Sequence, residues 1–462
     1  MTNQNWKQQY NNVDESLEKI KNIKSVATAF NTNIDAVIKI KPEHILNFIS
    51  TLKISKSELL NIEHRKINSK KDVVKGIFRC FKDGIAEEWL TDDIEIYKWM
   101  DSNIGYDRLQ MGGQGGIISN AISICGAQNV IAHCNSLPSK QAEQFLKLDN
   151  LKSFDDEANL RPAHEINRSD LPLIHWIIEF DKGDEIIIEG EKFTCPKSNR
   201  FIATYDPLNL NLVINRAFKE YFYKEKFEYM LLSGFHALTS ENHGENLIDN
   251  ACEILKQWKN NSPESIIHLE VASTQDVKIR SKIVNSIIPI VDSIGTNERE
   301  TIDILEVIEE NEFAKLCDED TSVENLFDAL IIIKNKTKAK RIQLHMFGLY
   351  ITIQDKNYPI SPIKNKNGMC LAATVAASKA GLGDIHKREN LLWAKSIPVD
   401  AFAFSQLEKL SNHLDKKEIL ETGICEFENF DIIATPTKLV EKPKTLVGMG
   451  DTISSISLLG AR

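Results

Sequence analysis

Short apolar runs alternate with amphipathic segments along most of the chain, and this alternation constrains the fold more than any other feature. The strands predicted from the apolar runs cover residues 25–30, 129–132, 229–233, 266–271, 287–294, 341–345 and 431–434. Helices predicted between them include 245–259, 301–313, 322–335 and 368–380. Such alternation is typical of a mostly parallel sheet with helices on both faces. We therefore predict an α/β fold whose ligands bind at the carboxyl ends of the strands.

Two regions depart from this pattern and predict a second, smaller sheet. Residues 34–40 alternate between two faces, and residues 173–180 and 185–188 are expected as antiparallel strands around the turn Lys182-Gly183-Asp184. A small sheet over the carboxyl edge of an α/β domain would act as a lid. The expected large domain comprises 1–33, 111–168 and 204–462, and the expected lid comprises part of 34–110 together with 169–203.

Composition excludes several classes of protein. A chain of 462 residues is too long for one ordinary hydrophobic core, so we expect two domains or one enlarged α/β domain. Its net charge of −10 argues against a nucleic-acid-binding surface. The eight cysteines are scattered without a metal-binding or paired spacing, which favours reduced thiols. The N-terminus is polar, and no apolar run approaches the roughly 20 residues that span a bilayer. We expect a cytoplasmic protein with small-molecule partners, no nucleic acid and no membrane; the oligomeric state is left open.

The sequence Gly448-Met449-Gly450-Asp451 precedes a helix-compatible stretch at the C-terminus. A helix N-terminus offers free backbone N–H groups to an anion, and glycines allow a phosphate to approach the backbone. A carboxylate beside such an anion hole suits a base that takes a proton from an attacking hydroxyl. The competing interpretation is a loop that ends in a helix cap. A second copy, Gly381 to Asp384, follows a run of small helical residues and is interpreted as a helix C-terminus and turn.

Asn297 and Glu300 follow a predicted strand and share one helical face, and Glu270 ends another strand. Asparagine and carboxylate oxygens suit Mg²⁺, which keeps several waters. The alternative for Asn297 and Glu300 is a capping box. His268 is interpreted as a core histidine.

Polar and glycine-rich segments complete the candidate set. Asp35, after the first strand, suits hydrogen bonds from a polyol or an Asx turn. The loop from Gly112 to Gly116 fits neither a dinucleotide fingerprint nor a Walker A motif, and it suits close approach of a sugar or phosphate or close helix packing. Arg200, at the end of the small sheet, suits a phosphate contact or a plain surface position.

In chain order, these motifs resemble the archaeal ADP-dependent sugar kinases, the glucokinases and phosphofructokinases of the ribokinase-like superfamily. The resemblance extends from about residue 25 to the end of the chain, and the Asn/Lys-rich composition is similar to methanogen members. The matching segments are Asn33-Ile34-Asp35, Gly112-Gly113-Gln114-Gly115-Gly116, Asn199-Arg200-Phe201-Ile202, His268-Leu269-Glu270, Asn297 to Glu300, and 435–440 leading into Gly448 to Asp451.

The resemblance implies a ribokinase-like core, a β-sheet lid and a role for each matching residue. Asp451 would be the catalytic base and Gly448, Met449 and Gly450 the anion hole. Mg²⁺ would be held, largely through water, by Glu270, Asn297 and Glu300 with Asp451. Sugar contacts would come from Asp35, Glu88, Gly113 and Gln114, with the Glu88 contact falling on Glu87 if the match shifts by one residue. Arg200 would approach phosphate, and the nucleotide would contact Asn297, Val440, Asp451 and the segment His345 to Tyr350.

The resemblance also implies the reaction: transfer of the β-phosphoryl of ADP to fructose 6-phosphate, giving fructose 1,6-bisphosphate and AMP, with glucose as a second acceptor. The ADP preference rests on the resemblance alone. Two alternatives are an ATP-dependent ribokinase-like sugar or nucleoside kinase and a non-catalytic sugar- or nucleotide-binding protein.

Overall fold

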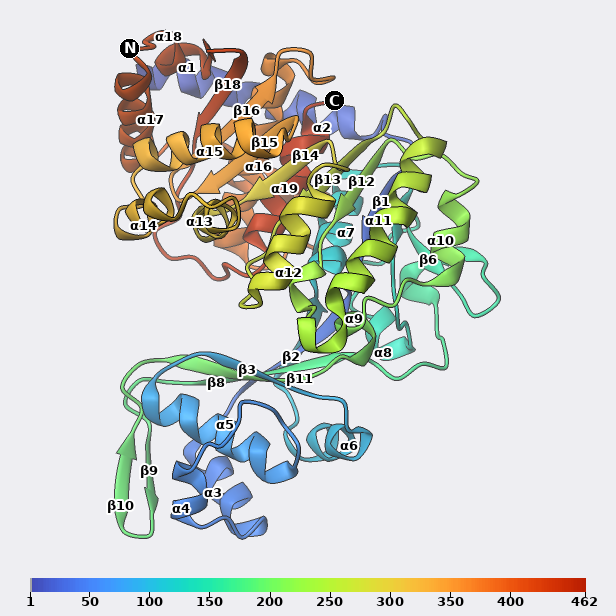
Figure 1. The fold of residues 1–462 in the computed structure, drawn as a ribbon, viewed down its shortest axis with the longest axis vertical. Helices are drawn as coiled ribbons and strands as arrows, with labels where there is room; N and C mark the ends of the chain where they lie inside the picture. The colour runs from blue at the N-terminus through green and yellow to red at the C-terminus, as the bar shows by residue number, and fades with distance from the viewer. Residues whose placement is uncertain (1) are drawn as a thin grey trace.

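The computed structural model describes residues 2–462, with side chains from Trp6 onward, and shows a large body joined to a smaller one at a waist (Figure 1). Both ends of the chain lie in the large body. Its eleven-stranded sheet has the order β17-β18-β16-β15-β14-β13-β12-β1-β5-β6-β7. In chain order the strands are β1 (Val26–Ala29), β5 (Val130–Ala132), β6 (Leu151–Phe154), β7 (Leu160–Pro162), β12 (Tyr229–Leu232), β13 (Ile266–Glu270), β14 (Ser293–Thr296), β15 (Arg341–Met346), β16 (Leu349–Asp355), β17 (Ile424–Phe427) and β18 (Phe430–Pro436).

Seven neighbouring strands in the middle of the sheet are parallel: β15, β14, β13, β12, β1, β5 and β6. Antiparallel strands extend the sheet at both edges. Because β18 is antiparallel to β16, it runs in the same direction as β15. The carboxyl ends of β1, β12, β13, β14, β15 and β18 therefore meet at one edge, which faces the waist. The α/β class and the mostly parallel sheet predicted from the sequence are confirmed.

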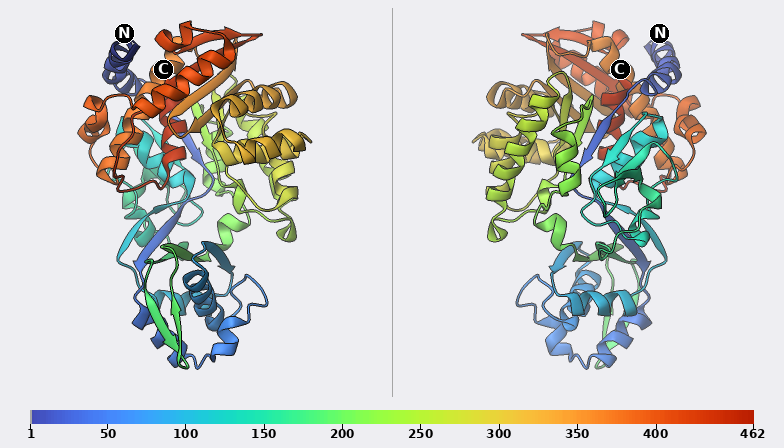
Figure 2. Two further views of the ribbon diagram at one scale, coloured as in Figure 1. Left: turned by 90° about the vertical axis from the view of Figure 1, so that its left-hand side faces the viewer. Right: turned by 90° about the vertical axis from the view of Figure 1, so that its right-hand side faces the viewer.

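Helices cover both faces of this sheet (Figures 1 and 2). The long helices α16 and α19 pack against each other, and α7 packs against α19. The helices of the large body are α1 (Thr2–Gln9), α2 (Val13–Ile20), α7 (Gln114–Cys125), α8 (Ser139–Ala142), α9 (Pro207–Leu210), α10 (Arg216–Phe222), α11 (Gly244–Asn261), α12 (Val277–Lys282), α13 (Glu298–Val307), α14 (Asn311–Glu319), α15 (Val323–Thr337), α16 (Pro362–Leu382), α17 (Ala401–Leu414), α18 (Glu418–Thr422) and α19 (Met449–Gly460).

Two predicted elements differ from the structure. The isoleucine-rich run at 287–294 was expected as a strand, but α12 continues into a π-helical turn at Ile283–Ile287 and the strand begins only at Ser293. The turn buries Ile283, Val284 and Ile287, so helical packing accounts for part of this apolar run. The helix expected at 301–313 is two helices, because Glu309 has the positive φ of 65° that ends a right-handed helix.

The smaller body contains a five-stranded sheet with the order β3-β11-β8-β2-β4. These strands are β2 (Asn33–Lys39), β3 (Glu87–Thr91), β4 (Arg108–Gly112), β8 (Ile174–Phe180) and β11 (Asn199–Tyr205); its helices are α3 (Pro42–Thr51), α4 (Lys56–Leu60), α5 (Lys70–Asp83) and α6 (Ile94–Asn103). The strands expected at 173–180 and 185–188 exist, but β8 pairs with β2 and β11, while β9 (Glu185–Ile188) pairs with β10 (Glu191–Thr194) in a separate hairpin.

One face of the small sheet is apolar and the other is polar. Alternate residues such as Trp89, Trp176 and Phe201 are buried in a hydrophobic cluster of their own, separate from that of the large body. The residues between them, including Asp35 and His175, point to the opposite face, because successive side chains of a strand alternate. In Figure 1 the helices α3 to α6 lie on one side of this sheet and the large body on the other. We propose that the two hydrophobic clusters mark a large domain and a lid domain.

All eight cysteines are free and buried. Among the described residues, no helix is both long and apolar enough to cross a membrane.

Candidate active site

Asp451 lies in the first turn of α19, at the carboxyl edge of the large sheet. Gly448 precedes the helix with φ 64°, a conformation that favours glycine, and turns the chain into α19. The Asp451 side chain is 6% exposed, and its Oδ1 is buried without a hydrogen-bond partner. Burial and the nearby Glu270 raise the pKa of Asp451 to about 7, against the lowering effects of Gln114 and Lys379. A carboxylate held in this way is ready to accept a proton near neutral pH.

Glu270 fills a space between β14 and α19 that two glycines leave open. A Cβ at Gly295 would lie 2.1 Å from Glu270 Oε2, and a Cβ at Gly450 would lie 3.1 Å from Glu270 Oε1. His345 Nε2 lies 3.4 Å from Glu270 Oε1, and His268 Nε2 lies 3.5 Å from Oε2. Burial lowers the pKa of both histidines and raises that of Glu270, so the imidazoles are neutral at pH 7. The structure therefore brings the predicted residues Glu270, His345 and Gly450 together.

Asn297 and Glu300 form the capping box that the sequence left as an alternative. Asn297 Oδ1 accepts from the Glu300 amide at 3.0 Å, and Glu300 Oε2 accepts from the Asn297 amide at 2.8 Å. The cap fixes the Glu300 carboxylate in the first turn of α13, beside the other acids. Burial raises the pKa of Glu300 well above its ordinary value, and the charges of Glu270 and Asp451 raise it further. The capping box thus holds Glu300 in place beside two acids that disfavour its ionised form.

These three acids fit a divalent cation that is held largely through water. Glu270 Oε2 and Asp451 Oδ1 are buried and lack hydrogen-bond partners, and the charges of Glu270 and Asp451 disfavour the ionised form of Glu300. Between residues 2 and 462, no three His, Cys, Asp or Glu side chains converge closely enough to hold an ion directly. Mg²⁺ often keeps several waters and takes only one or two carboxylates from the protein.

The polar face of the small sheet carries a second cluster, opposite the first. Asp35 and His175 are neighbours on β2 and β8, and His175 Nε2 lies 3.0 Å from Asp206 Oδ2. Burial lowers the pKa of His175, but Asp206, Glu88 and Asp35 raise it to about 9, so the ring is an imidazolium among three carboxylates. Burial raises the pKa of Asp35, against the lowering effect of His175. Such alternating donors and acceptors suit the hydroxyl groups of a sugar.

Glu87 and Glu88 lie on opposite faces of β3. The structure therefore distinguishes the two residues between which the sequence left the sugar contact open. Glu88 Oε1 accepts from Thr204 Oγ1 at 2.6 Å and lies 3.8 Å from His175 Nδ1. Glu87 instead accepts from Arg79 Nε and from Trp89 Nε1, on the side of the sheet that α5 covers. Glu88 therefore belongs to the polar cluster with Asp35.

The glycine loop allows β4 and α7 to pack closely against the chain that follows β1. A Cβ at Gly112 would lie 2.2 Å from Asp35 Oδ1, and one at Gly113, which has φ 73°, would lie 2.7 Å from Asn33 Oδ1. The loop thus positions Asp35 by close packing. Gln114, the first residue of α7, contacts the Asp451 carboxylate and has its Oε1 buried without a partner. The loop therefore joins the lid cluster to the cluster around Asp451.

Arg200 and Val440 lie farther from these clusters. Arg200 is exposed on β11, on the same face of the sheet as Thr204 and beside Glu179 of β8. Val440 is partly buried in the loop that follows β18, and the structure gives it no polar contact. Both assignments stay predictions.

Several site residues were missed in the sequence. His175 had a detectable signal, because it is a polar residue within the mostly apolar strand β8; Asp206 had none. Phe347 and Phe402 are 66% and 46% exposed, with ring centroids 5.5 Å apart, and they lie beside the β15–β16 turn. An exposed aromatic pair next to His345 is a candidate surface for a flat base.

A buried carboxylate at a helix N-terminus, with two further buried acids beside it and a separate polar sheet face, suits an α/β phosphotransferase. Comparison with known proteins gives the family. A family model described as "ADP-specific Phosphofructokinase/Glucokinase conserved region" matches residues 24–460. The chain therefore belongs to the ADP-specific phosphofructokinase/glucokinase family.

Relatives in both branches of the family match almost the whole chain. An ADP-dependent glucose/glucosamine kinase of Pyrococcus furiosus is 31% identical, covering 98% of each protein. An ADP-specific phosphofructokinase of Methanosarcina acetivorans is 27% identical, covering 92% of this chain and 91% of the relative. The structure of the last common ancestor of ADP-dependent phosphofructokinases from Methanosarcinales superposes with a TM-score of 0.89 at 30% identity, covering 99% of this chain and 98% of that one. An ADP-dependent kinase in complex with fructose 6-phosphate and ADPβS superposes with a TM-score of 0.80, also at 30% identity, covering 99% and 97%.

Proposed function

We propose that this protein transfers the β-phosphoryl group of ADP to fructose 6-phosphate, giving fructose 1,6-bisphosphate and AMP, and that it also phosphorylates glucose. The observation that carries the proposal is the position of Asp451, a buried carboxylate in the first turn of α19 opposite the lid cluster of Asp35, Glu88 and His175. Relatives named for each reaction support both acceptors.

In the proposed mechanism, Asp451 takes the proton of the sugar hydroxyl as that oxygen bonds to the β-phosphorus of ADP. The bond from this phosphorus to the bridging oxygen breaks, and AMP leaves with the electron pair. The free N–H groups of the first turn, at Met449 and Gly450, receive the charge that develops on the transferred group. The raised pKa of Asp451 matches its basicity to neutral pH, since a fully ionised carboxylate with an ordinary pKa of 3.8 would be a weaker base.

The lid cluster would orient the sugar. Asp35 and Glu88 accept hydrogen bonds from hydroxyl groups, and the His175 imidazolium donates one while Asp206 holds its ring. Arg200, exposed on the same face of the sheet, would approach phosphate when the lid closes. Closure would expel water from between the two clusters and strengthen each of these contacts.

Glu270, Asn297 and Glu300, with Asp451, would hold Mg²⁺ through water. When bound, the ion supplies positive charge that neutralises the phosphoryl oxygens. For the nucleotide, His345 and Val440 would contribute contacts, and the exposed pair Phe347 and Phe402 would hold the adenine at the carboxyl edge of the sheet.

The test is an assay of purified protein with ADP or ATP against fructose 6-phosphate and glucose, with AMP measured directly. We expect AMP from ADP with both acceptors and a far lower rate with ATP. Turnover with ATP alone would identify an ATP-dependent kinase of related fold. Tight binding of nucleotide and sugar without phosphorylated product would identify a non-catalytic binding protein. Either outcome overturns the proposal.

A further inference from the structure

Lys379 is a cation beside the N-terminus of α19 that the proposed mechanism does not use. It lies in the last turn of α16, and its stem is partly buried against α19. A Cβ built at Gly448 would lie 3.3 Å from Lys379 Nζ, so the ammonium is next to the residue that starts the anion hole. This position follows from the packing of α16 on α19, the two long helices that meet beneath the carboxyl edge of the sheet.

The ammonium group is held near acids without being paired to one. In the described part of the chain, no carboxylate oxygen lies within 4.0 Å of Lys379 Nζ, although many surface lysines form such pairs. Burial lowers the pKa of Lys379, while the charges of Asp384 and Asp451 raise it. Because no carboxylate of the described residues is paired with the Lys379 ammonium, its hydrogen-bond donors are free for a ligand.

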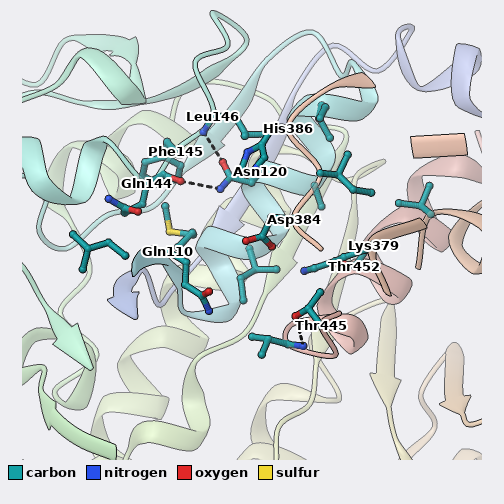
Figure 3. A pocket seen from close by; sticks show the side chains of 18 of the residues that line it. Gln110, Asn120, Gln144, Phe145, Leu146, Lys379, Asp384, His386, Thr445 and Thr452 are labelled. Carbon is teal, nitrogen blue, oxygen red and sulfur yellow. Dashed lines mark hydrogen bonds between the residues drawn. The ribbon is translucent and has the colours of Figure 1, made fainter. Parts of the chain in front are cut away.

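Asp384 belongs to the second Gly-x-Gly-Asp sequence. Its backbone fits the predicted turn, because α16 ends at Leu382 and Gly383 follows with φ 89°. Its side chain, however, lines a cavity of about 280 Å³ together with Lys379, Thr445 and Thr452 (Figure 3). Thr452 is the neighbour of Asp451, so this cavity reaches the first turn of α19. The second motif thus places its carboxylate in the same cavity as Lys379, where its charge acts on the ammonium.

We propose that Lys379 contacts the transferring phosphoryl group at the N-terminus of α19, and that Asp384 positions Lys379 for this contact. The proposal rests on the phosphoryl transfer proposed above. Lys379 keeps its proton throughout; it adds a fixed positive charge at the point where backbone N–H groups receive the transferred group. A positive charge is needed there, because Asp451, Glu270 and Glu300 make this end of the site acidic before a diphosphate enters it.

The first test compares Lys379→Met with Lys366→Met, using ADP and fructose 6-phosphate at saturating Mg²⁺. Lys366 is a matched control, because it is a buried lysine on the same helix that bonds Gln9 and lies more than three turns away. We expect Lys379→Met to lower kcat roughly 10- to 100-fold, the size of effect seen when one group that stabilises the developing charge is removed. The dissociation constant for AMP, which lacks the transferred group, should not change, and Lys366→Met should keep the wild-type kcat.

The second test reads the contact without turnover. AMP, fructose 6-phosphate and aluminium fluoride together mimic the transferring phosphoryl group, and we expect aluminium fluoride to raise the melting temperature of the wild type beyond AMP and sugar alone. Lys379→Met should lose this increment and keep the shift given by AMP and sugar, and Lys379→Arg should restore part of it. Asp384→Asn alone should lower kcat several-fold. Added to Lys379→Met, the same substitution should have no further effect on kcat, because Asp384 acts through Lys379.

AMP formation by the wild type tests the proposed function. The kcat of Lys379→Met relative to that of the wild type tests the role of Lys379. A Lys379→Met enzyme with wild-type kcat and an intact aluminium fluoride increment would overturn the proposal while leaving the function standing. Equal losses in kcat and in AMP affinity would overturn it as well, since they would show that Lys379 only supports the fold.

Discussion

At the scale of single residues, the site depends on carboxylates whose protonated form the fold favours. Asp451 is the clearest case, because its pKa rises from an ordinary value of 3.8 to about 7 through burial and the charge of Glu270. An acid whose pKa is raised on folding destabilises the folded protein at every pH at which the acid is ionised in the unfolded chain. The raised pKa that suits Asp451 for catalysis therefore lowers the stability of the folded protein when no substrate is bound.

This cost predicts a stability change with a defined pH dependence. Between pH 3.8 and about 7 the folded state holds a proton on Asp451 that the unfolded chain has released, so the free energy of unfolding falls as the pH rises and the penalty is complete above pH 7. Asp451→Asn should raise the free energy of unfolding of the metal-free protein by on the order of 2 kcal/mol at pH 8. Urea unfolding at pH 8 and pH 5.5 should show that the gain shrinks at the lower pH.

Asp276 provides a control of opposite sign, because hydrogen bonds from Ser240 and from the first turn of α12 lower its pKa despite burial. Asp276→Asn should give no gain at pH 8. If Asp451→Asn gave no gain in the free energy of unfolding over the wild type at any pH, as expected for Asp276→Asn, the pKa of Asp451 would not be raised in the folded protein.

Glu88 should govern the use of glucose. Its carboxylate, held by Thr204, lies on the polar face of the small sheet, and losing an acceptor for a sugar hydroxyl commonly costs about 1.5–3 kcal/mol. Glu88→Leu should therefore lower kcat/KM for glucose roughly 10- to 100-fold. The value for fructose 6-phosphate should change far less, because phosphate contacts would dominate its binding.

The control is Glu87→Leu, which removes the neighbouring carboxylate on the opposite face of β3. Its effect on the two sugars should be equal, because Glu87 bonds Arg79 and Trp89 within the lid. Equal losses on both sugars in Glu88→Leu would show a structural or catalytic role, and a loss of glucose selectivity only in Glu87→Leu would show that the register is wrong by one residue.

At the scale of elements, the capping box at the start of α13 has a second consequence. Glutamine also serves at the third position of a capping box, so Glu300→Gln keeps the helix start and removes one negative charge. We expect this variant to need roughly 10- to 100-fold more Mg²⁺ for half-maximal rate. Glu306→Gln, on the same helix but paired with Arg280, should leave the titration unchanged. An unchanged titration in Glu300→Gln would reduce Glu300 to its capping role.

Elements also show how far the sequence predicts this fold. The buried strands β1, β5, β12, β13, β15 and β18 were predictable, because continuous apolar runs between helices indicate a parallel sheet. The π-helical turn at Ile283–Ile287 was not, since its apolar residues suit a buried helix as well as a strand. The pairing of β8 with β2 was not predictable either, because these two strands are far apart in the chain and no local signal links them.

The same division applies to the site. Asp451, Glu270, Asn297 and Glu300 follow strands or begin helices at one edge of a sheet, and their motifs marked them. Lys379 lies at the C-terminal end of a long helix, where a lysine is ordinary, and only the packing of α16 on α19 brings it to Gly448. The side chain of Asp384 shows the same limit, because a turn motif gives its backbone and not its direction.

At the scale of the whole molecule, the two clusters lie on separate bodies joined at a waist (Figure 2). Asp451 and the acids around it belong to the large body, and Asp35, Glu88 and His175 belong to the sheet of the smaller body. Phosphoryl transfer needs both clusters in contact with one pair of substrates and needs water excluded. The molecule should therefore become more compact when both substrates are bound.

Small-angle X-ray scattering of Asp451→Asn, which should bind substrates without consuming them, measures this change. We expect ADP, Mg²⁺ and fructose 6-phosphate together to decrease the radius of gyration, and each substrate alone to give a smaller decrease. A radius of gyration unaffected by both substrates would show that the lid is fixed and that the site is assembled before binding.

The central claim is that Asp451 at the start of α19 is the base for phosphoryl transfer, and its most direct test is the turnover of Asp451→Asn with ADP and fructose 6-phosphate. The variant keeps the size and the helix start while removing the base, so kcat should fall on the order of 100-fold or more. The dissociation constant for ADP, measured by calorimetry, should stay within a few-fold of the wild type. Near-normal turnover with intact ADP binding would contradict the account.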